Sequence, residues 1–282
     1  MKLNKVFASA ASVAFLAAAL AGCSSDAGQG AVAEGCTPES VFSTVTAGTL
    51  TVSVPEFPPF SSTTDGTMSG VDAEILNSFA KRNCLTVTTQ STSYAGTIPA
   101  VQSDRVDVAI GCYYRTAARA EIVGLSDPIY TDQMASISAD GIVDVSAMEA
   151  LKVGTVDGYL WVPDMKTVMG DNLTIYPSAV EMKADYEAGR IQVGLDGYGS
   201  AALMYDGSAD ATVKAVAADS RVVASQEPAQ IGFPHTKSNT ALTEALNTSI
   251  AAMKTDGSIE SILVANGLPA TSGETGEPRL VQ

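Results

Sequence analysis

The chain has 282 residues, of which 31 are acidic and 16 basic, and its formal net charge at neutral pH is −15. Nucleic-acid-binding proteins need a basic surface, so this charge argues against nucleic acid as a partner. The sequence holds one histidine, His235, and four cysteines whose spacings fit no zinc site, so we expect no bound metal. No cofactor is expected either.

The N-terminus carries the pattern of an export signal over residues 1–22. Lys2 and Lys5 precede an apolar, alanine-rich stretch at 6–20 that is too short to span a bilayer comfortably. The motif "LAGC" then resembles a bacterial lipoprotein signal, which implies cleavage before Cys23 and attachment of lipid to its sulfur. The alternative is a secretory signal that merely contains a cysteine. A lipid-anchored protein on the extracytoplasmic face of the cell membrane is therefore expected, since two or more acyl chains hold a protein stably.

Both ends of the remaining chain have flexible compositions. Residues 23–35 are mostly Ser, Gly and Ala, as in a tether, and residues 271–282 are expected to form a disordered tail. About 235 residues lie between them, enough for two lobes or one large domain.

The first half of this region alternates strand and helix patterns. Strands are predicted at 49–54, 85–90 and 106–111, with helices from residue 71 and at 95–103. This rhythm predicts a parallel α/β sheet with right-handed crossovers.

The pattern then restarts as a second unit. Strands are predicted at 134–139, 152–156, 173–177, 191–196, 221–225 and 229–234, with helices at 145–151 and 179–189. Two more helices within 239–268 have no sheet of their own and should pack back on the first unit. The predicted lobes are 36–133 with 232–270, and 134–231. Two crossing segments would join them as a hinge over a cleft.

A pair of arginines, Arg115 and Arg119, follows the predicted strand at 106–111. Arginine at the end of a buried strand is costly unless a negative group meets it. Its planar fork suits a carboxylate, so the pattern predicts a clamp for a small anion. The alternative is a solvated pair on a helix surface beside Glu121.

The cysteines allow one disulfide outside the membrane. Cys36 precedes the first strand and Cys84 ends the first helix, and we favour this pair. Closing that loop would contribute roughly 4 kcal/mol in the chain-entropy model. Cys112 would remain a free thiol.

In their order along the chain, several segments resemble the bacterial extracellular solute-binding proteins of family 3, the amino-acid receptors of ABC importers. The likeness runs from about residue 48 to residue 267. It rests on "AGTLTVSVPEFPPF", "GVDAEI", "IPAVQSDRVDVAIG", "RTAAR", "LSDPIY", "KVGTVDGY", "GRIQVGLD" and "MKTDGSIESIL". The resemblance implies a type II periplasmic-binding-protein-like fold, with two α/β lobes that close on a ligand.

The resemblance also implies roles for individual residues. The family's carboxylate-binding arginine falls on Arg119, and its hydroxyl contacts fall on Cys112 and Tyr114. The acid that meets the ligand's amino group falls on Asp196.

Three more positions in the first lobe match family contacts. Phe57 matches an aromatic wall, and Tyr94 matches an apolar or aromatic contact. Asp72 lies where some relatives reach the ligand's side chain, although it could instead cap the helix that it begins.

The sequence departs from the family pattern at the second lobe. Gly158 starts a turn whose N–H groups could bind an anion, but the usual hydroxyl is missing. Tyr159 and Trp161 offer aromatic faces that could stack on an apolar or cationic ligand, or Trp161 could pack in the core. Arg115 is additional, and alternation suggests that it points away from the site toward an acid such as Asp127.

The function that the resemblance implies is capture of an amino acid or related zwitterion and its delivery to ABC permease and ATPase subunits, without catalysis. A polar or cationic amino acid is the leading ligand class, ahead of aromatic amino acids and non-α-amino compounds. A ligand-sensing receptor and a dehydratase-like enzyme are the alternatives. For an enzyme, Glu56 or Asp157 could be a general acid, whereas His235 should lie away from the cleft.

Overall fold

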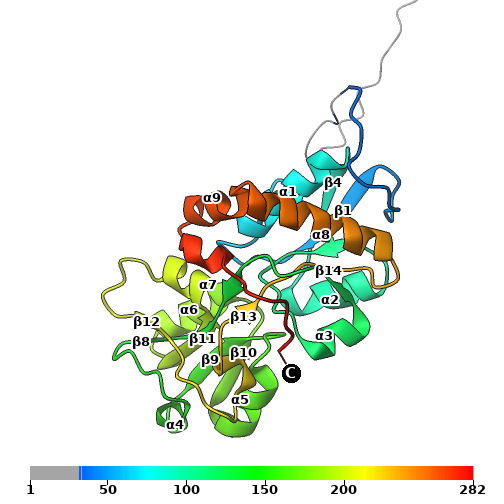
Figure 1. The fold of residues 1–282 in the computed structure, drawn as a ribbon. Helices are drawn as coiled ribbons and strands as arrows, with labels where there is room; N and C mark the ends of the chain where they lie inside the picture. Colours follow the sequence, from blue (N-terminus) through cyan, green and yellow to red (C-terminus); the bar gives the residue numbers. More distant parts are fainter. Residues whose placement is uncertain (1–31, 33, 282) are drawn as a thin grey trace, which may run out of the picture.

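The computed structural model describes residues 32 and 34–281, which form two α/β lobes (Figure 1). The predicted signal peptide and Cys23 lie outside these residues, as does nearly all of the predicted tether. Within the described part, no helix combines the length and the apolar character needed to cross a membrane.

The first lobe is built on a sheet with strand order β4-β1-β5-β14-β6. Its three leading strands are parallel, as predicted, with Val52 of β1 in register with Val108 of β5. The last two strands run antiparallel to their neighbours. The strands are β1 (Thr49–Val54), β4 (Thr86–Ser91), β5 (Val108–Ala109), β6 (Gly124–Leu125) and β14 (Pro234–His235), and a hairpin of β2 (Ser62–Thr64) and β3 (Thr67–Ser69) lies beside them.

Helices from both ends of the sequence cover this sheet. They are α1 (Val71–Arg82), α2 (Tyr94–Gln102), α3 (Ala117–Ile122), α8 (Thr240–Thr255) and α9 (Ser258–Ala265). The two C-terminal helices lie on the first lobe, where α9 packs against α1 (Figure 1). The expectation that they return to the first unit is confirmed, because their apolar faces find their partners there.

The second lobe is built on a sheet with strand order β10-β9-β11-β8-β12. Its strands are β8 (Met134–Ser138), β9 (Val153–Val156), β10 (Leu173–Tyr176), β11 (Val193–Gly197) and β12 (Thr212–Ala215). Its helices are α4 (Val145–Met148), α5 (Val162–Met169), α6 (Ala179–Glu187) and α7 (Tyr198–Met204), with a short 3-10 turn, η1 (Gly170–Asn172). The strand β8 is antiparallel to both β11 and β12.

The strand predicted at 221–225 is wrong. This stretch contains a 3-10 turn, η2 (Val223–Ser225), and the edge strand is β12, which the sequence reasoning missed. The Ser225 hydroxyl donates to the carbonyl of Val222 at 2.7 Å and accepts from the N–H of Asp219 at 2.9 Å. These local hydrogen bonds compete with sheet formation despite the β-branched residues.

Two short strands carry the chain between the lobes. β7 (Thr131–Asp132) and β13 (Ala229–Gln230) pair antiparallel, so the two crossings lie side by side as a two-segment hinge. The cleft lies beside β7 and β13, and aromatic side chains of the two lobes meet across it.

The structure contains the predicted disulfide between Cys36 and Cys84, whose Cα atoms are 5.8 Å apart. It ties the segment before β1 to the end of α1. Cys112 is a buried free thiol, also as expected.

The prediction of a disordered tail is wrong. After the 3-10 turn η3 (Ala270–Gly273), the chain runs as an ordered strap across the hinge (the red segment in Figure 1). The side-chain amide of Gln230 donates to the carbonyls of Thr275 at 2.8 Å and Glu277 at 2.7 Å, and accepts from the N–H of Arg279 at 2.7 Å. These partners are far away in sequence, so composition alone does not reveal them. We call residues 274–281 the C-terminal strap.

Arg115 is part of this strap's anchorage. Its guanidinium donates to the carbonyl of Ser126 at 2.9 Å, to the Gln230 side chain at 3.0 Å and to the carbonyl of Arg279 at 2.8 Å. Burial lowers the pKa of Arg115, and the nearby charge of Asp127 opposes that shift. The residue is thus not solvated beside Glu121, and carbonyl groups rather than an acid hold it.

Candidate functional site

The cleft between the lobes encloses a small cavity of about 10 Å³, the room of about one water molecule. The residues around it come from both lobes and from the hinge. They are Phe57, Tyr94, Cys112, Tyr114, Arg119, Asp132, Tyr159, Leu160, Trp161 and Gly197. Most of the predicted ligand-binding positions therefore lie together, with Asp72, Gly158 and Asp196 as the exceptions.

Aromatic rings close the cleft. The Tyr159 ring of the second lobe lies 5.6 Å from Phe57 and 4.9 Å from Tyr94 of the first lobe, between centroids. Trp161 lies 6.1 Å from Tyr114 across the same gap. Tilted and edge-on ring contacts at these distances are favourable, so the rings hold the lobes together.

Trp161 lies between the interior of the second lobe and the cavity. Its indole N–H donates to the Thr155 hydroxyl at 2.8 Å inside the second lobe, and its ring also lines the cavity.

Arg119 reaches from the first lobe toward the second. One η nitrogen donates to the carbonyl of Tyr114 at 2.9 Å, and the other donates to the carbonyl of Gly158 at 3.3 Å. The guanidinium also lies 5.1 Å from the centroid of the Tyr113 ring. Thr116 caps α3 by accepting from the N–H of Arg119, which fixes the start of the helix. Within residues 34–281, no carboxylate lies within ion-pair distance of this guanidinium.

Gly158 is a contact between lobes rather than part of the cavity wall. Its φ of 84° lies in the left-handed region that favours glycine. A Cβ there would lie 3.0 Å from the Cα of Ala95, at the start of α2. The absence of a side chain lets the turn approach α2 and offer its carbonyl to Arg119.

Asp196, the acid expected to meet the ligand, is fully buried behind the cavity wall. Its Oδ1 accepts from the Tyr159 hydroxyl and the N–H of Gly197, both at 2.8 Å, and its Oδ2 accepts from the Ser200 hydroxyl at 3.2 Å. Burial raises the pKa of this carboxyl to about 7. In this closed state Tyr159 stands between Asp196 and the cavity.

Asp132 is the acid that does line the cavity, and sequence reasoning missed it. Its Oδ2 accepts from the Tyr114 hydroxyl at 3.1 Å, and its Oδ1 accepts from the N–H of Gly199 at 3.2 Å. Burial raises the pKa of Asp132 to about 6. The available signal was its place two residues after "LSDPIY", where the chain must cross between the predicted lobes.

Asp72 lies outside the cavity and does not cap its helix. The N-cap of α1 is Gly70, with no side-chain hydrogen bond. The Asp72 carboxylate instead accepts from the N–H groups of Gly111 and Cys112, both at 2.8 Å, and from the Tyr130 hydroxyl at 2.7 Å. The side chain thus positions the cavity wall from behind.

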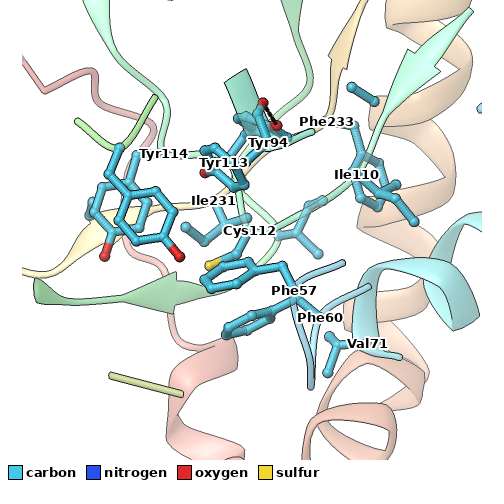
Figure 2. Packing of buried hydrophobic residues seen from close by; sticks show 14 of the residues in the cluster. Phe57, Phe60, Val71, Tyr94, Ile110, Cys112, Tyr113, Tyr114, Ile231 and Phe233 are labelled. Atoms are coloured by element: carbon cyan, nitrogen blue, oxygen red, sulfur yellow. Dashed lines mark hydrogen bonds between the residues drawn. The ribbon is translucent and has the colours of Figure 1, made fainter. Parts of the chain in front are cut away.

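Cys112 presents its sulfur to the cavity beside the Phe57 ring (Figure 2). The neighbouring Tyr113 hydroxyl donates to the carbonyl of Tyr94 at 2.8 Å, which locks the wall to α2. Burial raises the pKa of the Cys112 thiol well above its ordinary value, so this group is a neutral, weakly polar contact.

The residues considered for catalysis lie elsewhere. His235 is fully buried in β14 and its ring nitrogens bond to the Phe233 carbonyl and the Thr243 hydroxyl. Glu56 and Asp157 are exposed. In the described part of the chain, no group of His, Cys, Asp and Glu side chains is arranged to hold a metal ion.

Comparison with known proteins agrees with this architecture. Residues 50–265 match the family described as "Bacterial extracellular solute-binding proteins, family 3". The chain belongs to this family. By this description, its members are extracellular proteins that bind solutes.

Individual relatives are distant. The chain is 25% identical to the "Putative ABC transporter arginine-binding protein 2" of Escherichia coli K12 over 213 residues, which is 73% of this chain and 85% of that protein. It is 26% identical to the "Probable histidine-binding protein" of Campylobacter jejuni over 118 residues, which is 40% of this chain and 46% of that relative. The second match thus spans less than half of that relative's length.

Among solved structures, an ancestral arginine-binding protein bound to arginine superposes with a TM-score of 0.68 at 24% identity. The match covers 78% of this chain and 98% of that one. The likeness establishes that the two proteins share a fold.

Proposed function

We propose that this protein captures an amino acid between its lobes and delivers it to the permease and ATPase of an ABC importer. We further propose that lipid on Cys23 anchors it to the outer face of the cell membrane. The family membership and the export pattern at the N-terminus support this role.

One observation carries the amino-acid assignment. Among the described residues that line the cavity, Arg119 alone carries a positive charge. Two of its N–H groups are engaged by main-chain carbonyls, and a guanidinium has about five donors. The remaining donors can hold a ligand carboxylate through charge-assisted hydrogen bonds.

Closure of the lobes explains how binding is coupled to delivery. A ligand that touches both lobes favours the closed state by its differential affinity. Arg119 would bind the α-carboxylate from the first lobe. Asp196, once the Tyr159 hydroxyl gives up its hydrogen bond, would meet the α-ammonium from the second lobe. Phe57, with the other aromatic rings, would enclose the rest of the molecule.

Two relatives named for arginine or histidine, together with the solved arginine complex, favour a cationic amino acid as the ligand. The aromatic lining also suits such a side chain, because cations bind well over ring faces.

Titration calorimetry and thermal shift over a panel of amino acids test this proposal. A bound ligand raises the melting temperature by mass action, so at least one amino acid should do so. Arg119→Ala should abolish binding, Arg119→Lys should weaken it, and the exposed control Arg105→Ala should leave it unchanged. Full affinity in Arg119→Ala would refute the carboxylate clamp.

The anchor has its own test. Metabolic labelling with a radioactive fatty acid should mark the wild-type protein, and Cys23→Ser should move the protein from the membrane fraction to the soluble fraction. Membrane retention of an unlabelled Cys23→Ser protein would show that another anchor holds it.

A further inference from the structure

We infer that Asp132 selects the ligand's side chain, and that the ligand is an amino acid whose side chain ends in a guanidinium or amine held against this carboxylate. The inference rests on the proposed function, because it places the α-carboxylate at Arg119.

Asp132 is a buried carboxylate with only neutral partners. It accepts from the hydroxyl of Tyr114, the thiol of Cys112 at 3.7 Å, and the main-chain N–H groups of Gln133 and Gly199. Throughout residues 34–281, no lysine, arginine or histidine forms an ion pair with it. Buried charges are ordinarily paired with an opposite charge, so a cation is the missing complement.

The charge around Asp132 points the same way. Asp72 and Asp196 are also buried close behind the cavity wall and also have no cationic partner among the described residues. Arg119 is the single described cation at the cavity, against these three acids. The proximity of Asp132 raises the pKa of Asp196 in addition to the effect of burial. A second positive charge, supplied by the ligand, would balance part of the negative charge of these carboxylates.

The positions of Arg119 and Asp132 at the cavity indicate which ligand group meets Asp132. Arg119 donates to the carbonyl of Tyr114, while the hydroxyl at the far end of Tyr114 donates to Asp132. The two charged groups therefore contact opposite ends of Tyr114. An α-carboxylate bound at Arg119 leaves the extended cationic side chain of the amino acid to reach Asp132.

The walls between these ends fit the same ligand. Tyr94 and Trp161 line the cavity with ring surface that suits methylene groups and a planar guanidinium. At Gly197 a Cβ would lie 2.6 Å from the Asp132 carboxylate, so glycine leaves that oxygen accessible. Because the closed cavity holds only about 10 Å³, the lobes must separate before the ligand enters.

The test compares L-arginine with L-citrulline, which has nearly the same shape but a neutral end group. Calorimetry on the full chain is run at pH 8, above the pKa of about 6 for Asp132. Wild type should prefer arginine by about 100-fold or more, the scale expected when one buried charge loses its partner. In Asp132→Asn, arginine affinity should fall by about 100-fold while citrulline binds as well as before. The exposed control Asp157→Asn should keep the wild-type preference.

Each outcome separates the inference from the proposed function. If wild type binds citrulline or glutamine as tightly as arginine, Asp132 does not select a cation, although the amino-acid receptor role stands. If Asp132→Asn loses arginine and citrulline equally, the inference is also overturned, because the carboxylate then serves the α-ammonium or the fold. Binding of no amino acid by wild type would instead refute the proposed function. The wild-type comparison requires no variant, so it holds even if Asp132→Asn does not fold.

Discussion

Asp72, in the first turn of α1, fixes the main chain of Cys112 at the cavity wall through a hydrogen bond of 2.8 Å. Cys112 has a φ of 55°, a left-handed conformation that costs a non-glycine residue about 1–2 kcal/mol. The carboxylate stabilises this conformation because it also accepts from the preceding residue, Gly111. The position of the Cys112 side chain in the cleft thus depends on a residue that never touches the cavity.

Replacing Asp72 should therefore destabilise the fold. Asp72→Ala leaves two buried N–H groups without an acceptor, and the free energy of unfolding should fall by about 3 kcal/mol. Urea unfolding at neutral pH measures the change. The exposed acid Asp206 provides the control, since Asp206→Ala should change stability by no more than about 0.5 kcal/mol. Equal stability of the two variants would contradict the role given to Asp72.

Tyr159 should control closure of the lobes. Tyr159→Ala removes the ring that meets Phe57 and Tyr94, so the ligand-free protein should shift toward an open state with a larger radius of gyration. Tyr159→Phe keeps the ring and loses only the hydrogen bond to Asp196, so it should remain closed. Small-angle X-ray scattering compares the three proteins. A compact Tyr159→Ala variant would show that the ring contacts do not hold the lobes.

The buried acids of the cleft predict a pH dependence of stability. Burial raises the pKa of Asp132 from 3.8 to about 6 and that of Asp196 to about 7. The folded state then holds protons that the unfolded state has lost, so these acids reduce stability as pH rises from about 4 to about 7. For Asp132 the loss is at most about 3 kcal/mol.

Scanning calorimetry of the ligand-free protein at several pH values in this window checks that sign. The melting temperature of wild type should fall relative to that of Asp132→Asn as pH rises. Asp219, whose pKa is lowered to about 2 by Arg221, acts below this window and is common to both proteins. Parallel curves for the two proteins would mean that Asp132 does not titrate in this range.

The disulfide should contribute substantially to stability. Cys36 and Cys84 are separated by 48 positions, and closing such a loop stabilises the folded state by about 4 kcal/mol in the chain-entropy model. The double variant Cys36→Ser/Cys84→Ser should melt at a lower temperature, and reductant should lower the melting temperature of wild type but not that of the variant. Cys112→Ser serves as the control, because it leaves the disulfide intact. An unchanged melting temperature in the double variant would refute this contribution.

Periodic patterns predicted the main strands and the parallel centre of the first sheet, because alternating apolar residues determine which strand faces are buried. The β-branched run at 221–225 misled for a physical reason: the Ser225 hydroxyl satisfies local main-chain groups and closes a turn. Strand propensity depends on residue types alone, so it does not account for competition between these local hydrogen bonds and those of a sheet.

At the site, order along the chain placed Arg119, Phe57 and Tyr94 together, since each follows a strand of the same lobe. The sequence pattern did not reveal Asp132, because its strand β7 has only two residues and is too short to show an alternation of apolar and polar residues. Burial of Asp196 behind Tyr159 depends on a side-chain hydrogen bond between different elements, which no single segment encodes.

The C-terminal strap makes the end of this chain a sensitive place for engineering. Gln230 lies in β13, one of the two strands that join the lobes, and its side-chain amide donates to the carbonyls of Thr275 and Glu277. An affinity tag or fluorescent reporter fused after residue 282 would therefore be attached close to the hinge, where it could alter closure of the lobes. A biosensor built from this protein should therefore carry its label on the second lobe. Removal of the C-terminal strap should change the equilibrium between the open and closed lobes.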